Sequence, residues 1–117
     1  SHYDTYFSTL ARLLKPDGVA LLHSIGIMGP EGGSDPWIRK YIFPGGYCPT
    51  LSQAIAAAER AGLWVTDVEV LRLHYAETLR HWQERFAARR DEARALYDER
   101  FCRMWEFYLA ACEAGFR

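Results

Sequence analysis

Two polar side chains that could do chemistry each follow an apolar run of the sequence. His23 comes directly after Val19–Leu22, and Tyr75 follows the apolar positions of 63–73. A histidine titrates near neutral pH and can act as a base or bind an anion, and a tyrosine hydroxyl can donate to an anion. By residue type alone, a partly buried structural histidine and an ordinary amphipathic tyrosine are the commoner roles. Both readings therefore stay open at this point.

The apolar runs before these residues predict buried strands. Val19–Leu22 shows no alternation and follows a Pro-Asp-Gly turn, which is typical of a strand covered on both faces of a parallel sheet. Segment 63–73 predicts a second strand, with its β-branched and aliphatic residues at Val65, Val68, Val70 and Leu71. Ligands of doubly wound α/β folds bind beyond the carboxyl ends of the strands. We therefore expect His23 and Tyr75 at one sheet edge, where Gly26 would let a ligand approach the backbone.

Helices are predicted on either side of the first strand. Apolar residues at intervals of three and four predict a helix over 3–14, which the Lys15–Gly18 turn ends. Thr50 is the expected N-cap of a helix over 51–61 that stops at Gly62. Strand, helix and strand in this order favour a parallel arrangement with a right-handed crossover. The fold class expected from these residues is therefore α/β.

The segment 26–49 is rich in glycine and proline, which excludes a long helix or strand. It nevertheless carries large apolar side chains, so we expect it to pack onto the rest of the chain: Trp37, Ile38, Tyr41, Ile42, Phe43 and Tyr47. Asp35 and Pro36 are the expected N-cap and first residue of a short helix over 37–41.

The final third of the chain is predicted to be helical. Glycine and proline are absent from 75–113, and we expect two helices with a break near Arg89–Asp91. Aromatic residues recur at helical spacing in this part: Trp82, Phe86, Phe101, Trp105 and Tyr108. Such a stripe is usually core, but the number of rings favours a roof over an apolar ligand pocket.

Composition excludes several classes of function. The 117 residues carry a formal net charge of -1, without the basic excess of a dedicated nucleic-acid binder. No apolar run is long enough to span a bilayer. The three cysteines and four histidines show no zinc-ligand spacing, so no metal site is expected. The sequence also lacks a glycine-rich nucleotide loop, so no cofactor-binding residue is expected within this chain.

The motifs taken together resemble one family. Six segments carry the likeness over essentially the whole chain: YDTYF (3–7), LKPDG (14–18), LLHSIG (21–26), DPWIRKYIFPGG (35–46), HYAETLRHW (74–82) and FCRMWEFYLAACEAGF (101–116). They resemble the C-terminal part of the cyclopropane-fatty-acyl-phospholipid synthases, the S-adenosylmethionine-dependent family that includes the mycolic-acid cyclopropane synthases. DPWIRKYIFPGG is the most specific of these motifs, and LLHSIG alone would be weak.

The resemblance implies the fold and the chemistry. It implies that 1–117 is the distal, C-terminal portion of a class I, Rossmann-like methyltransferase domain, with helix/strand units over 3–73 and a large helical portion over 74–116, so that the chain is helix-rich overall. The sheet of that fold places a further strand, absent here, between the two expected strands. The implied reaction adds a methylene from S-adenosylmethionine to a cis double bond of a phospholipid acyl chain, through a carbocation and with bicarbonate as base. The implied bicarbonate site includes His23, the Ile25 backbone amide and Tyr75.

The resemblance also implies a partner and a location. The substrate would be an unsaturated phospholipid acyl chain, held in a pocket for which we expect five residues: Gly26, Tyr41, Phe43, Trp105 and Tyr108. The enzyme would be cytoplasmic and peripheral to the inner membrane surface. The part that binds S-adenosylmethionine would lie upstream, so we expect this chain alone to be inactive, to expose strand edges, and to associate or swap with further copies.

Two alternatives remain from the sequence. One is another S-adenosylmethionine methyltransferase that adds a plain methyl group to a lipid or a small amine. The other is a non-enzymatic helical module whose aromatic stripe holds an apolar ligand or a protein partner.

Overall fold

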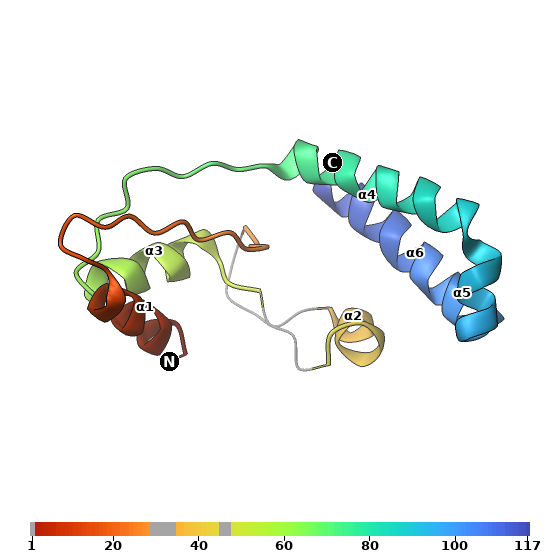
Figure 1. Cartoon of the computed structure of the whole chain (residues 1–117), viewed down its shortest axis with the longest axis horizontal. Helices are drawn as coiled ribbons and strands as arrows, with labels where there is room; N and C mark the ends of the chain where they lie inside the picture. The colour runs from red at the N-terminus through yellow and green to blue at the C-terminus, as the bar shows by residue number, and fades with distance from the viewer. Residues whose placement is uncertain (1, 29–34, 45–47) are drawn as a thin grey trace. The chain divides into compact units, whose positions relative to one another are not determined.

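The computed structural model describes residues 2–28, 35–44 and 48–117, and over these residues it contains six helices (Figure 1). Their bounds are α1 His2–Leu13, α2 Pro36–Tyr41, α3 Leu51–Arg60, α4 Arg72–Ala88, α5 Arg90–Leu96 and α6 Glu99–Phe116. The chain divides into two compact units, residues 1–68 and 69–117, which we describe separately. None of the described helices is both long and apolar enough to cross a membrane.

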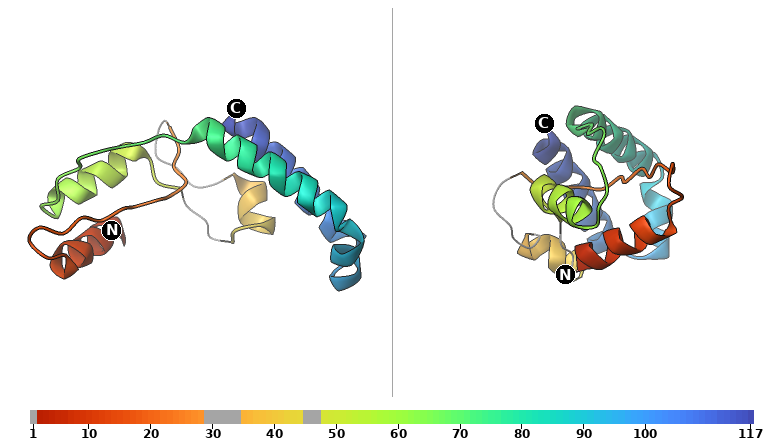
Figure 2. Two further views of the ribbon diagram at one scale, coloured as in Figure 1. Left: turned by 45° about the horizontal axis from the view of Figure 1, so that its top comes forward. Right: turned by 90° about the vertical axis from the view of Figure 1, so that its left-hand side faces the viewer.

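The core of the first unit lies between α1 and α3, which lie side by side in Figures 1 and 2. Phe7 of α1 is buried against Ala57 and Ala58 of α3. The alanines let the two helices approach, and half-buried residues surround the contact: Tyr3, Leu10, Ala54, Ala61 and Leu63. The apolar stripe predicted over 3–14 thus faces the helix predicted over 51–61.

The ends of α3 follow the predicted signals. Thr50 Oγ1 accepts a hydrogen bond from the Gln53 N–H at 3.2 Å, and Gln53 Oε1 accepts one from the Thr50 N–H at 2.9 Å. This reciprocal capping box satisfies two amide groups that the first helical turn leaves unpaired. After the helix, Gly62 has a φ of 81°, a conformation that favours glycine. The predicted start and stop of this helix are confirmed.

The short helix α2 also begins as predicted. The Asp35 carboxylate accepts a hydrogen bond from the Trp37 N–H at 2.9 Å, and Pro36 occupies the first turn. Trp37 and Ile38 are half-buried, whereas Tyr41 and Phe43 are exposed. The predicted packing of the 26–49 segment is therefore only partial over the described residues, and Tyr47 lies outside them.

The second unit is an antiparallel helical hairpin in which α4 runs along α6 (Figure 1). Its buried contact consists of Ala76 and Leu79 from α4 and Cys102, Tyr108 and Leu109 from α6. A part-buried hydrogen bond from Gln83 Nε2 to Glu113 Oε2, 2.7 Å long, joins the two helices. At the open end of the hairpin, the Arg72 guanidinium donates to the carbonyl oxygens of Phe116 and Arg117.

The predicted break between helices is confirmed at Arg89, which separates α4 from α5. A second break, not predicted, falls at Tyr97 and Asp98, and the Asp98 carboxylate caps α6 by accepting from the Phe101 N–H at 2.7 Å. α5 is tied back to α6 by Arg90, whose Nε lies 2.9 Å from Glu106 Oε1 and whose Nη1 lies 3.0 Å from Glu99 Oε2.

The two predicted strands are absent from the described residues. Val19 and Leu21 are 88% and 94% exposed, and Trp64 is 93% exposed. α4 begins at Arg72, inside the second predicted strand. The reason is that a strand is held by hydrogen bonds to a neighbouring strand, and over residues 2–28, 35–44 and 48–117 neither segment has one. The two strands predicted over Val19–Leu22 and 63–73 therefore do not form within the described residues, whose regular structure is helical.

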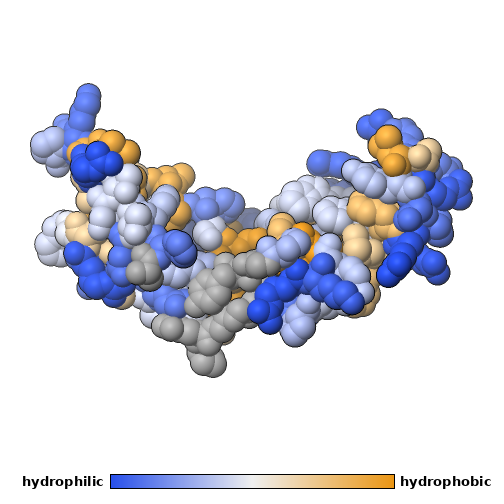
Figure 3. All heavy atoms as spheres, turned by 90° about the horizontal axis from the view of Figure 1, so that it is seen from below, coloured by the Kyte–Doolittle hydropathy of each residue, from blue (hydrophilic) through white to orange (hydrophobic). Residues whose placement is uncertain are grey.

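An isolated parallel bridge, which was not predicted, lies among the described residues. It joins Ile27 to Thr50, with the Ile27 N–H donating to the Pro49 carbonyl at 2.9 Å. On the face drawn in Figure 3, apolar residues lie at the surface among hydrophilic ones. This agrees with the exposure of the segments that were expected to be covered.

Candidate functional site

His23 and Ile25 lie next to each other in an exposed, irregular segment of the first unit. The Ser24 hydroxyl donates to the Ile25 carbonyl at 2.9 Å. Within the described part of the chain, neither the His23 imidazole nor the Ile25 N–H makes a hydrogen bond. That these two groups bind bicarbonate is untested and stays a prediction.

Gly26 is close to the backbone that follows α2. A Cβ atom at this position would lie 3.3 Å from the Pro49 carbonyl oxygen, which is tighter than an ordinary contact. The absence of a side chain therefore permits the hydrogen bond between Ile27 and Pro49. Its expected role in a substrate pocket is untested and stays a prediction.

Tyr75 lies in the first turns of α4 and is half-buried against aromatic neighbours. Its ring meets Phe116 of α6 at a centroid distance of 4.7 Å and Trp82 of α4 at 6.0 Å, both edge to face. Burial raises the pKa of the Tyr75 hydroxyl, and the nearby Cys112 thiol adds to the rise. The hydroxyl therefore keeps its proton at neutral pH and can donate to an anion.

Tyr108 and Trp105 share one side of α6. Tyr108 is 7% exposed, and its ring lies 5.1 Å from that of Trp105. Burial, with smaller contributions from Cys112 and Tyr75, raises the pKa of Tyr108 to about 12. Burial also raises the pKa of the Cys112 thiol, against a hydrogen bond with Tyr108 that lowers it. The α4–α6 hairpin thus brings Tyr75, Tyr108 and Cys112 close together in their protonated forms.

The remaining expected pocket residues, Tyr41 and Phe43, lie at the end of α2. The Tyr41 ring stacks at an angle on Trp37, 5.5 Å away, and Lys40 Nζ lies 5.0 Å from the Tyr41 ring centroid. Phe43 follows the helix, and its N–H donates to the Ile38 carbonyl at 2.9 Å. Both rings are partly exposed, at 38% and 51%.

The expected site residues therefore fall into two groups. His23, Ile25, Gly26, Tyr41 and Phe43 belong to the first unit, and Tyr75, Trp105 and Tyr108 to the second. Within the second unit the residues do gather around one hairpin. That Tyr75 completes a site with His23 remains a prediction. Cys112 and Phe116, which flank Tyr75, were not chosen from the sequence, although they follow Tyr108 at successive intervals of four residues, which places all three on one side of a helix.

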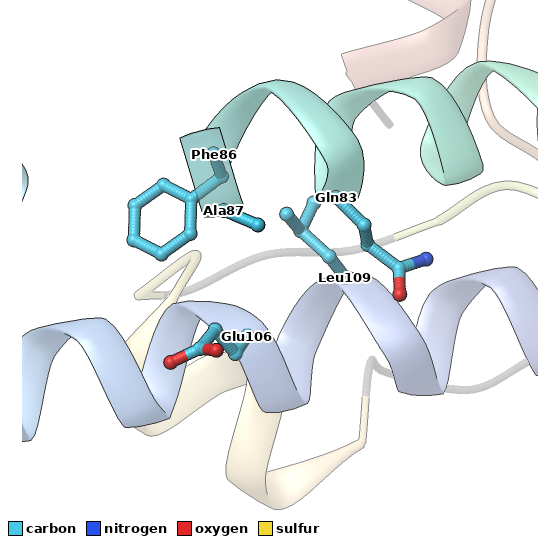
Figure 4. A pocket seen from close by; sticks show the side chains of 5 residues that line it. All are labelled: Gln83, Phe86, Ala87, Glu106 and Leu109. Atoms are coloured by element: carbon cyan, nitrogen blue, oxygen red, sulfur yellow. The ribbon is translucent and has the colours of Figure 1, made fainter. Parts of the chain in front are cut away.

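A hollow of about 200 Å³, which Tyr75 does not line, lies on the α4–α6 hairpin (Figure 4). Gln83, Phe86 and Ala87 of α4 and Glu106 and Leu109 of α6 line it. Its polar groups are already engaged, since Gln83 bonds to Glu113 and Glu106 to Arg90. Over the described residues, no cluster of histidine, cysteine, aspartate or glutamate could hold a metal ion.

Comparison with protein families matches residues 1–117 to the family described as mycolic acid cyclopropane synthetase. The tuberculostearic acid methyltransferase UfaA1 of Mycobacterium tuberculosis is 47% identical over 119 residues, which cover 96% of this chain and 28% of that protein. The cyclopropane-fatty-acyl-phospholipid synthase of Escherichia coli K12 is 44% identical over 116 residues, covering 99% of this chain and 30% of that protein.

A solved structure is also similar to this chain over almost its whole length. The mycolic acid cyclopropane synthase CmaA1, complexed with SAH and CTAB, matches 99% of this chain with a TM-score of 0.87 and 33% sequence identity. The match covers 45% of that protein's chain. This chain thus spans less than half the length of each of these relatives.

Proposed function

The chain belongs to the mycolic acid cyclopropane synthetase family, and we propose that it forms the C-terminal portion of an enzyme that transfers a methylene from S-adenosylmethionine to a cis double bond of a phospholipid acyl chain. The observation that carries the proposal is the match to the Escherichia coli synthase, which is 44% identical over 99% of this chain. Because the chain spans 30% of that protein, we expect it to need the remaining part for activity.

The donor chemistry of this chain fits a small anion. S-adenosylmethionine, when bound, supplies the transferred carbon, and bicarbonate, when bound, supplies the base. His23 and the Ile25 N–H would donate hydrogen bonds to the bicarbonate, since neither is engaged elsewhere among the described residues. Tyr75 would donate a third, because a tyrosine hydroxyl is protonated at neutral pH and burial raises its pKa further. Fixed donors of this kind hold a base in place while charge develops on the substrate.

The aromatic side chains suit the second proposed ligand, the acyl chain of the phospholipid. An acyl chain needs an apolar wall, and positive charge that develops on it is stabilised by ring faces. Trp105 and Tyr108 provide adjacent rings on α6, and Tyr41 and Phe43 provide rings near α2. With Gly26 they form the proposed substrate wall of a cytoplasmic enzyme that works at the inner membrane surface.

A second product class is favoured by a specific observation. UfaA1, whose name gives it as a tuberculostearic acid methyltransferase, is 47% identical to this chain, which is similar to the 44% of the synthase. A methyl-branched product is therefore the rival of the cyclopropane. The two share the transfer of one carbon to the alkene and differ in which proton is lost afterwards.

The test is a chimera of the Escherichia coli synthase in which residues 1–117 of this chain replace the matching segment. Purified chimera, S-adenosylmethionine and a phospholipid with a monounsaturated chain are incubated with bicarbonate, and the lipid is analysed by mass spectrometry and proton NMR. We expect a product that gains CH2 and loses its vinyl protons. A branched alkene of equal mass that keeps vinyl protons would instead establish the methyltransferase reading.

Two controls make a negative result informative. The unmodified synthase reports that the assay works, and circular dichroism with S-adenosylmethionine binding reports that the chimera folds. A folded chimera that binds S-adenosylmethionine but modifies no lipid would contradict the proposed function. Replacement of His23 by alanine in the active chimera should lower turnover at least about tenfold, since a positioned donor at a developing charge contributes on that scale.

A further inference from the structure

Tyr75 is held by its ring and not by its hydroxyl. The ring meets Phe116 edge to face at a centroid distance of 4.7 Å and Trp82 at 6.0 Å. Over the described residues, the hydroxyl takes part in no hydrogen bond that would fix its direction. The packing of the ring therefore decides where the hydroxyl points.

Phe116 is the neighbour that fixes this ring across the helical hairpin, and we propose that it is a positioning residue, which orients the Tyr75 hydroxyl toward bicarbonate. Trp82 follows Tyr75 by two turns of α4, so its contact fixes the ring only relative to its own helix. Phe116 belongs to α6, and its contact fixes the ring relative to the second helix. The inference rests on the proposed function, because the anion-binding role of Tyr75 comes from there.

Phe116 is itself anchored to α4. Arg72 Nε donates a hydrogen bond to the Phe116 carbonyl at 3.2 Å. Arg72 is the first residue of α4 and Phe116 the last of α6, so the guanidinium lies at the negative end of the α6 dipole. Nearly one turn earlier in α6, Glu113 accepts a hydrogen bond from Gln83 of α4 at 2.7 Å. The last turn of α6 is thus tied to α4, and the Phe116 ring is in place before any ligand binds.

Loss of the Phe116 ring keeps the Tyr75 hydroxyl but frees the tyrosine to take other rotamers. Bicarbonate then has to order the tyrosine when it binds, and ordering one side chain lowers affinity by about threefold to tenfold. A purely structural role of Phe116 predicts a different result, in which the hairpin is less stable but the folded protein keeps its affinity. The two roles are therefore distinguished by the affinity for bicarbonate and not by stability.

The experiment measures the affinity of the Escherichia coli chimera for bicarbonate, with S-adenosylmethionine bound, and it requires no product formation. Tyrosine isotopically labelled at Cζ reports the anion through the NMR signal of Tyr75, which is identified as the signal missing from Tyr75→Phe. Phe116→Leu removes the ring contact, and Phe116→Tyr keeps an aromatic ring. Phe86→Leu is the matched control, because Phe86 is half-buried in the same unit and lies about 16 Å along α4 from Tyr75.

A second variant covers the case in which Phe116→Leu does not fold, which circular dichroism and S-adenosylmethionine binding report. Arg72→Gln loosens the end of α6 and leaves the ring in place, and it should weaken bicarbonate binding about threefold. Arg85→Gln, a change at another exposed arginine of α4, is its control and should leave the affinity unchanged. Equal affinities of these two variants would count against the inference.

We expect the Kd for bicarbonate to rise about threefold to tenfold with Phe116→Leu, and to stay within about twofold with Phe116→Tyr and Phe86→Leu. Three results would overturn the inference: an unchanged Kd in a folded Phe116→Leu chimera, equal changes with Phe116→Leu and Phe86→Leu, or a Tyr75 signal that bicarbonate does not move.

The proposed function fails on a different result. A chimera that binds bicarbonate as expected but modifies no lipid contradicts the function and supports the positioning role of Phe116. A chimera that forms the cyclopropane while bicarbonate leaves the Tyr75 signal unmoved supports the function and overturns the positioning role.

Discussion

The ring of Tyr75 at the start of α4 meets the ring of Phe116 at the end of α6, with centroids 4.7 Å apart and the planes inclined by 67°. This contact closes the open end of the helical hairpin, close to the Arg72 contact with the last carbonyl groups. The residue that the family resemblance assigns to anion binding therefore also has a packing role. Substitutions at Tyr75 must therefore distinguish the packing role of the ring from the anion-binding role proposed for the hydroxyl.

Two substitutions at Tyr75 separate these roles. Tyr75→Phe keeps the ring, so we expect the free energy of unfolding to change by less than about 1 kcal/mol. Tyr75→Ala removes the edge-to-face contact and should cost about 2 kcal/mol, measured by urea denaturation. In the active chimera both should lower turnover at least about tenfold. Full turnover with Tyr75→Phe would contradict a role of the hydroxyl in binding the anion.

Leu109 should be among the most costly positions for truncation. It is 1% exposed between α4 and α6. Leu109→Ala is expected to lower the unfolding free energy of the second unit by about 3 kcal/mol, because a cavity remains where the side chain was. Leu96→Ala, at an exposed position, should stay within about 0.5 kcal/mol. Urea denaturation followed by circular dichroism compares the two, and equal losses would mean that the α4–α6 contact is not the core of this unit.

Lowering the pH should reduce the stability of the α4–α6 hairpin because Glu113 becomes protonated. Hydrogen bonds from Arg117 and Gln83 hold the pKa of this carboxyl below its usual value of 4.5. The stabilisation is present at pH values above 4.5 and is lost as the pH falls from 4.5 through the lower folded-state pKa. The urea midpoint of Glu113→Gln should therefore depend less on pH in this window than that of the unaltered chain. Glu59→Gln, an exposed change in α3, serves as the control.

Raising the pH should reduce the stability of the second unit because Tyr108 loses its proton. Its pKa is raised from 10.0 to about 12, so folding stabilises the protonated hydroxyl. The resulting stability is complete below pH 10 and is lost as the pH rises from 10 toward 12. An absorbance titration should show a late tyrosinate step that Tyr108→Phe removes. If that variant titrates like the unaltered chain, the late step does not belong to Tyr108.

The exposed segments 19–22 and 63–71 should bind a hydrophobic dye and promote association of this chain. Leu21 and Trp64 are 94% and 93% exposed, and they lie in segments of strand-like composition. The double variant Leu21→Ser/Trp64→Ser should lower dye fluorescence and raise the concentration at which light scattering detects oligomers. Leu73→Ser, a change at a residue that is 63% exposed in α4, is the matched control. A well-defined monomer without dye binding would contradict the expectation.

Local signals explain which elements could be predicted. Asp35, Thr50 and Gly62 act through groups only two or three residues away, so the limits of α2 and α3 follow from the sequence. The break at Arg89 was also found, because helices of a small unit rarely run on for 40 residues. The break at Tyr97 was missed, although Asp98 is an ordinary N-cap type, because no glycine or proline marks it.

Tertiary contacts decided the rest. Val19–Leu22 has the composition of a buried strand, but a strand exists only when a neighbour accepts its hydrogen bonds, and the described residues supply none. The meeting of Tyr75 with Phe116 and Cys112 required the hairpin, since 41 and 37 positions separate these residues in the chain. The sequence alone thus determined the ends of α2 and α3 and, through its motifs, the family. The tertiary structure decided which runs are covered and which side chains meet, because burial depends on partners that lie far away along the chain.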